Sequence, residues 1–184
     1  MNPAEGTCEE FVRTWAEEVR RQVARVRELR ETFATQMGQA EHGASLGQRE
    51  LTGYGDPSPG QLDATSRRLW VAQHQVVWSA HQLERWSQRL AKERGDTPSS
   101  PDPVLVNLRN ALEHLDDAEF EDEGHAAADS DRRNRSLHAL PRAELFLGPD
   151  EYGGSKLFGL IDPADLEQRA LAVIEAAERE VWSD

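Results

Sequence analysis

One short segment of this 184-residue chain combines side chains that could carry out acid–base chemistry. Arg109, Asn110, Glu113 and His114 lie close together in the run Arg109-Asn110-Ala111-Leu112-Glu113-His114. Histidine titrates near neutral pH, so its imidazole can accept or donate a proton. A guanidinium can hold a phosphate and offset charge in a transition state, and an amide can orient a ribose or phosphate without adding charge. These residue types suit cleavage of RNA without a metal, in which a base takes the 2′-hydroxyl proton and an acid protonates the leaving oxygen.

The residues around this segment predict a helix from about Pro103 to Asp117 that carries it. The helix would have one apolar face, formed by Val104, Leu105, Leu108, Ala111, Leu112 and Leu115. Arg109 and His114 lie about 140° apart around such a helix, so they flank a polar surface rather than touch. A second copy of the helix, related by a two-fold axis, could close this surface into a cleft. The structural alternative is a solvated helix face with an ion pair between Arg109 and Glu113.

The segment Leu108-Arg109-Asn110-Ala111-Leu112-Glu113-His114 resembles the HEPN superfamily (higher eukaryotes and prokaryotes nucleotide-binding) of helical-bundle proteins. That family carries an Arg, often followed by Asn, and then a His after four to six residues. The resemblance implies a metal-independent endoribonuclease that acts as a homodimer, as in toxin–antitoxin and phage-defence systems. It also implies that Arg109 and His114 are catalytic, that Asn110 supports them, and that no cofactor is needed.

The letter pattern alone is not specific. Arg133-Asn134-Arg135-Ser136-Leu137-His138 satisfies it as well, and the run from Arg68 to His74 satisfies a looser form. The copy that ends at His138 lies in a polar stretch without an apolar face to fix it. The helical context therefore favours the copy from Arg109 to His114.

Four helical segments are predicted around this motif, and together they indicate an all-α protein. They run from about Thr7 to Gln39, Gln61 to Arg94, Pro103 to Asp117 and Pro163 to Trp182. Thr7 and Glu10 could form a capping box, and Asp102 and Asp162 each precede a proline suited to start a helix. We expect a single domain over residues 1–184, an antiparallel four-helix bundle with two long helices.

The second long helix is predicted to be apolar on two sides. Leu69, Val76, Leu83 and Leu90 mark one stripe, and Trp70, Val77 and Trp78, with His74 and His81, mark another. Such a helix is either central in a bundle or shared between the core and a dimer interface. His74 and His81 lie too far apart along the helix to share a metal unaided, so we expect packed or interfacial histidines.

Three segments lack helical periodicity. Residues 43–60 concentrate Gly and Pro, and residues 118–136 are polar and charged, so both are expected to be flexible loops. Residues 138–160 contain short apolar runs separated by Gly-Pro and Gly-Gly. They predict irregular structure before the last helix, with room for a small hairpin.

Composition limits the classes of partner and location. The net charge of −13 disfavours a nonspecific grip on nucleic acid, although a local site could still bind a phosphate. The single cysteine, Cys8, cannot form an internal disulfide, and neither a signal peptide nor a membrane span is evident. We expect a cytoplasmic protein. The scarcity of lysine relative to arginine suggests a high-GC bacterial coding bias. The acidic residues after Leu115 lack the spacing of a calcium-binding loop, so no calcium site is predicted there.

Two other functions fit the same sequence. The first is a non-catalytic helical adaptor or antitoxin-like protein whose acidic surface covers a basic partner. The second is a nucleotide-binding bundle that senses its ligand without cleaving it.

Overall fold

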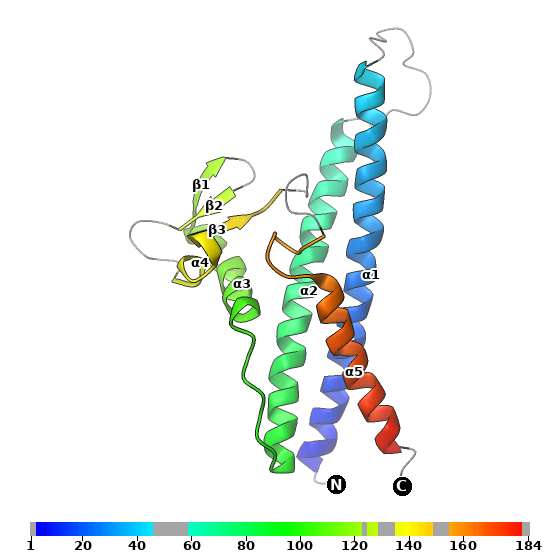
Figure 1. Cartoon of the computed structure of the whole chain (residues 1–184), viewed down its shortest axis with the longest axis vertical. Coiled ribbons are helices and arrows are strands. Elements are labelled where there is room, and N and C mark those ends of the chain that lie inside the picture. The colour runs from blue at the N-terminus through cyan, green and yellow to red at the C-terminus, as the bar shows by residue number, and fades with distance from the viewer. Residues whose placement is uncertain (1–2, 46–58, 123–124, 129–134, 149–154, 182–184) are drawn as a thin grey trace.

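The computed structural model describes residues 3–45, 59–122, 125–128, 135–148 and 155–181. Two long antiparallel helices, α1 (Pro3–Ser45) and α2 (Pro59–Arg94), run the length of the molecule (Figure 1). The shorter helices are α3 (Pro103–Glu113), α4 (Arg135–His138) and α5 (Pro163–Val181). Three short strands, β1 (Glu119–Asp122), β2 (His125–Ala127) and β3 (Glu144–Phe146), lie beside α3 and α4. The expected mostly helical class is confirmed.

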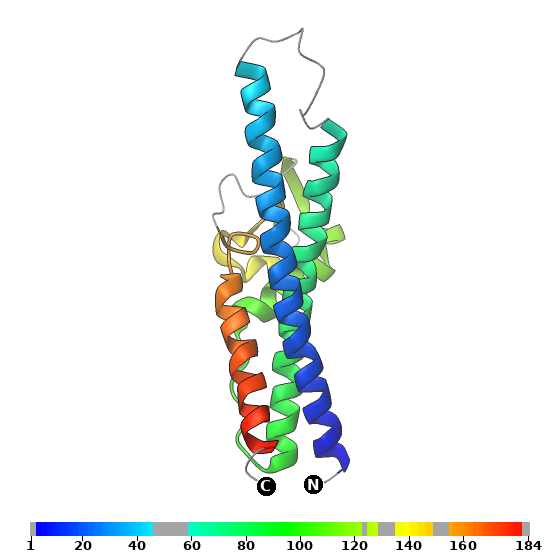
Figure 2. The ribbon, with the colours of Figure 1, turned by 90° about the vertical axis from the view of Figure 1, so that its right-hand side faces the viewer.

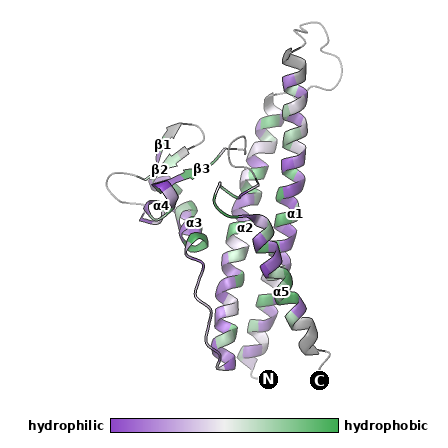
Figure 3. Cartoon of the chain, viewed as in Figure 1, coloured by the Kyte–Doolittle hydropathy of each residue, from purple (hydrophilic) through white to green (hydrophobic). Residues whose placement is uncertain are grey.

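Small apolar side chains hold α1 and α2 together. Their spacing of three and four residues places them on one side of each helix. The apolar core residues of these helices are Val12, Ala16, Val19, Val23, Val26 and Leu29 of α1, and Leu69, Ala72, Val76, Val77, Ala80 and Leu83 of α2. Polar and apolar segments alternate along both helices, as expected for helices with one buried face (Figure 3).

Helix α2 has neighbours on more than one side, in agreement with its two predicted stripes. It packs along α1, and α3 packs against it, while α5 lies mainly along α1 (Figures 1 and 2). The structure does not confirm the predicted antiparallel four-helix bundle, because α3 packs against α2 and α4 while α5 packs elsewhere. Within the described residues, no helix is long and apolar enough to cross a membrane.

The small sheet corrects the expectation of a flexible loop over residues 118–136. Strand β2 is central and pairs antiparallel with both β1 and β3, with Ala126 opposite Leu145. Both of these side chains are fully buried in the common core, and so is Leu137 of α4. Residues 138–160 are predicted to be irregular, with room for a small hairpin. Their described part contains a 3₁₀ turn (Pro141–Ala143), β3, and a turn closed by a bridge between Leu157 and Ile161, and residues 149–154 lie outside the described ranges. Residues 123–124 and 129–134 lie outside the described part of the chain.

Helix α3 ends at Glu113 and not at about Asp117 as predicted, and α4 has no counterpart in the prediction. The other helix boundaries follow the predictions, except at the first helix. That helix begins at Pro3, so the predicted capping box at Thr7 is wrong, and the Thr7 hydroxyl donates to the Pro3 carbonyl (3.0 Å) inside the helix. Asp162 Oδ1 accepts from Ala164 N (2.9 Å) at the start of α5, as expected. Of the expected loop over 43–60, both ends are helical, and residues 46–58 lie outside the described ranges.

Candidate functional site

The short helix α3 presents the candidate motif. Asp102 caps this helix by accepting hydrogen bonds from the backbone N–H groups of Val104 and Leu105 (3.0 and 3.3 Å). The helix ends at Glu113, and the backbone N–H of His114 donates to the Asn110 carbonyl (3.2 Å). Its buried residues, Leu105, Leu108, Ala111 and Leu112, fix its rotation against the rest of the molecule. The predicted apolar face is therefore the face that packs.

Arg109 lies where α3 meets α2. Its Nη1 is 2.5 Å from Glu113 Oε2 and donates to Asn110 Oδ1 (2.8 Å). Its guanidinium carbon lies 4.9 Å from the centre of the Trp78 ring on α2, within reach of a cation–π contact. The Arg109 side chain remains 21% exposed. The ion pair of the structural alternative is confirmed, and the Arg109 side chain is partly exposed although its Nε is buried.

Two histidines of α2 lie within electrostatic range of this ion pair. His81 is only 8% exposed, and burial lowers its pKa, helped by the positive charges of Arg109 and Arg85 and opposed by Glu113. Burial also lowers the pKa of His74, again against the charge of Glu113. Burial therefore favours the neutral form of both imidazoles.

The contact between the two helices leaves two buried nitrogens without a hydrogen bond. Among the described residues, neither His81 Nδ1 nor Arg109 Nε has a partner. Unpaired buried polar atoms are uncommon in folded proteins, and three others among the described residues lie on α1, namely Trp15 Nε1, Arg30 Nε and Gln36 Oε1. We call Trp78, His81, Arg109, Asn110 and Glu113 together the α2–α3 cluster.

The sequence pattern does not connect the α2 histidines with the motif. It predicts that His74 and His81 are packed or interfacial, and the burial of His81 confirms packing. The sequence feature that could have predicted the contact between α2 and α3 is the second stripe of α2, because its apolar side chains need an apolar neighbour. A short connection from α2 to the next amphipathic helix makes that helix the natural neighbour.

The two ends of the motif lie in different surroundings. Arg109, Asn110 and Glu113 are brought together, whereas His114 is exposed at the end of α3. In the second copy of the pattern, Arg133 and Asn134 lie outside the described residues, and His138 is exposed at the end of α4. The arrangement places the Arg109 guanidinium near two imidazoles whose neutral form is favoured. An anionic ligand of Arg109 would have to displace the Glu113 carboxylate or share the guanidinium with it.

The described residues contain no group of three or more His, Cys, Asp or Glu side chains placed to hold a metal ion. Comparisons with protein-family models, with curated proteins and with solved structures find no match to this chain.

Proposed function

We propose that this protein is a HEPN-like, metal-independent endoribonuclease that acts as a homodimer in a toxin–antitoxin or phage-defence system. The catalytic residues would be Arg109 and His114, with Asn110 in support. The observation that supports this proposal best is the Arg109 side chain, which is partly exposed and whose guanidinium contacts Trp78 and Asn110. An oriented guanidinium is suited to the two oxygens of a phosphodiester.

Each residue has a defined part in the proposed reaction. Arg109 binds the scissile phosphate, and Asn110 orients it. One His114 imidazole takes the proton of the 2′-hydroxyl, whose oxygen attacks phosphorus while the bond from phosphorus to the 5′-oxygen breaks. The second His114 of the dimer gives its proton to that 5′-oxygen. The products are a 2′,3′-cyclic phosphate and a free 5′-hydroxyl.

The test is cleavage of single-stranded RNA in EDTA by the wild type and by Arg109→Ala and His114→Ala. Loss of general acid–base catalysis should lower the rate by at least about a hundredfold in His114→Ala. Arg109→Ala should be comparably slow, because it removes the phosphate ligand. His138→Ala, an exposed histidine in the second copy of the pattern, is the matched control and should cleave normally. Equal rates in all four proteins, or no cleavage by any, would reject the catalytic proposal.

The ion pair of Arg109 gives a second test of the same site. Glu113→Gln removes the charge that competes with a phosphate for Arg109, so RNA affinity should rise severalfold. The fold should survive, because a partly exposed pair one helical turn apart contributes well under about 1 kcal/mol. Fluorescence anisotropy with labelled RNA measures the affinity. Glu93→Gln breaks the comparable pair with Arg89 on α2 and should leave RNA affinity unchanged.

A non-catalytic adaptor is the second candidate, and one observation favours it. Arg109 is already balanced by Glu113, so the cluster could serve packing alone while the acidic surface binds a basic protein. Stable co-purification with a basic partner, together with no RNA cleavage in EDTA, would favour the adaptor over the nuclease.

A further inference from the structure

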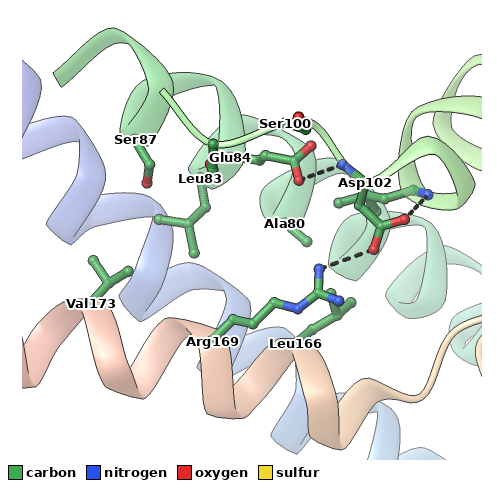
Figure 4. Close-up of a pocket in the computed structure, with 11 residues that line it drawn as sticks. Ala80, Leu83, Glu84, Ser87, Ser100, Asp102, Leu166, Arg169 and Val173 are labelled. Carbon is green, nitrogen blue, oxygen red and sulfur yellow. Dashed lines mark hydrogen bonds and ion pairs between the residues drawn. The ribbon is translucent and has the colours of Figure 1, made fainter. Parts of the chain in front are cut away.

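A cavity of about 480 Å³ lies between α2, the connection from α2 to α3, and α5 (Figure 4). Its volume is within the range of small-molecule sites. The apolar part of its lining is formed by Ala80, Leu83, Leu105, Leu166 and Val173. The polar part is formed by Glu84, Ser87, Ser99, Ser100, Asp102 and Arg169. Apolar walls with a few convergent polar groups are typical of ligand pockets.

Glu84 of α2 has unused hydrogen-bonding capacity in this cavity. Its Oε1 accepts from the backbone N–H of Asp102 (2.8 Å), and within the described part of the chain Oε2 has no partner. Burial raises the pKa of Glu84 and outweighs the hydrogen bond from Asp102. A donor that reached Oε2 would therefore stabilise the ionised carboxylate.

In Asp102, by contrast, both carboxylate oxygens already accept hydrogen bonds. Burial alone would raise its pKa, but the hydrogen bonds from Arg169 and from the backbone N–H groups of Leu105 and Val104 prevail, so the pKa is lowered. Arg169 Nη1 donates to Asp102 Oδ2 (3.0 Å), and the two side chains point toward each other in Figure 4. The two carboxylates and one guanidinium leave the cavity with an excess of negative charge.

We propose that this cavity binds a small organic cation, a primary ammonium on a compact apolar body. The ammonium would donate to Glu84 Oε2 and to the hydroxyl groups of Ser87 or Ser100. The apolar body would contact Leu83 and Leu166. An ammonium has three donors and no acceptor, which matches a carboxylate oxygen and hydroxyls as partners. This inference concerns a surface separate from the α2–α3 cluster and does not depend on RNA cleavage.

The test is isothermal titration of the full chain with 2-phenylethylamine, compared with 2-phenylethanol and 3-phenylpropionate. These probes share a phenyl body and differ in the polar head. The amine should saturate and bind at least about tenfold more tightly than either of the others, since charge-assisted hydrogen bonds exceed neutral ones. Equal or tighter binding of the alcohol or the acid would overturn the proposal. So would the absence of saturation by the amine up to about 10 mM.

Three variants test the assigned residues. Glu84→Gln keeps an oxygen for the Asp102 N–H but removes the charge, and should weaken amine binding about tenfold or more. Arg169→Gln, at a side chain that is 56% exposed, removes the opposing cation and should tighten amine binding severalfold. Glu93→Gln changes the same charge on α2 outside the cavity lining and should bind as the wild type does. Unchanged binding in Glu84→Gln, or loss of binding in Arg169→Gln, would reject the site, once circular dichroism shows that each variant is folded.

Discussion

Arg109 illustrates how a neighbour on another helix decides the role of a single residue. Its partners Asn110 and Glu113 come from its own helix and follow from sequence spacing. Trp78 comes from α2 and turns an ordinary surface pair into a half-buried one. An ion pair on a solvated helix face contributes little, whereas one packed against an aromatic ring has a defined geometry. That defined geometry is the main reason to test this arginine as a phosphate ligand.

The burial of His81 predicts a pH dependence of stability. Its folded pKa is lowered from 6.5, so below about pH 6.5 the unfolded chain binds a proton that the folded chain does not yet bind. Stability should fall as pH decreases from about 6.5 toward the folded pKa and should be flat with respect to this group above that range. One histidine contributes at most about 1.4 kcal/mol per pH unit.

Urea unfolding of the wild type and of His81→Gln between about pH 7.5 and pH 5 measures this dependence. In His81→Gln, the free energy of unfolding should change less with pH than it does in the wild type. His114→Gln, at an exposed position, is the control and should keep the full slope. Identical slopes for His81→Gln and the wild type would contradict the assignment.

Among the elements, α3 is a helix that depends on its surroundings. A helix of 11 residues is marginal in isolation, so its cap and its packing against α2 must hold it. Asp102 supplies the cap and also ties the start of α3 to Arg169 of α5. One side chain therefore links two helices that pack in different parts of the molecule.

Replacement of Asp102 should separate these two roles. Asp102→Ala removes both the cap and the ion pair, and should lower the free energy of unfolding by about 1–2 kcal/mol. Asp102→Asn can still cap the helix, so its loss should be well under about 1 kcal/mol. Chemical denaturation measures both values. Equal losses in the two variants would assign the effect to the charge rather than the cap.

The strands show why polar segments resist prediction. Strand β1 has the sequence Glu-Phe-Glu-Asp, and its one large apolar side chain, Phe120, is exposed. Among the strand residues whose burial the structure describes, the buried ones are Ala126 and Leu145, which lie far apart in the chain. The pairing of β2 with β3 depends on contacts that no local pattern records.

At the scale of the whole molecule, the helical hairpin holds the segment before α5. Arg30 of α1 donates to the carbonyl groups of Ser155 and Lys156. The Gln73 side-chain oxygen on α2 accepts from the backbone N–H of Phe158 (3.2 Å), and Gln73 itself is buried. These bonds connect positions far apart in sequence and fix where α5 begins.

Gln73 allows a sharp test of this connection. Gln73→Leu should leave the buried N–H of Phe158 without a partner and cost about 1–3 kcal/mol of stability. Gln75→Leu makes the same change at an exposed position of α2 and should stay within about 0.5 kcal/mol of the wild type. Urea denaturation measures both, and equal effects would show that the Gln73 bond contributes nothing.

The sequence by itself determined the four longer helices, α1, α2, α3 and α5, because each is specified locally. Apolar residues at steps of three and four defined α1, α2 and α3, and Asp102 and Asp162 marked the start of two helices. The motif residues and the ion pair of Arg109 with Glu113 followed from the same spacing. Only the tertiary structure placed His81 and Trp78 beside Arg109, paired the strands, and brought Glu84, Asp102 and Arg169 around one cavity. The physical reason is that helical hydrogen bonds join residues four apart, whereas the choice of neighbours depends on packing across the whole chain.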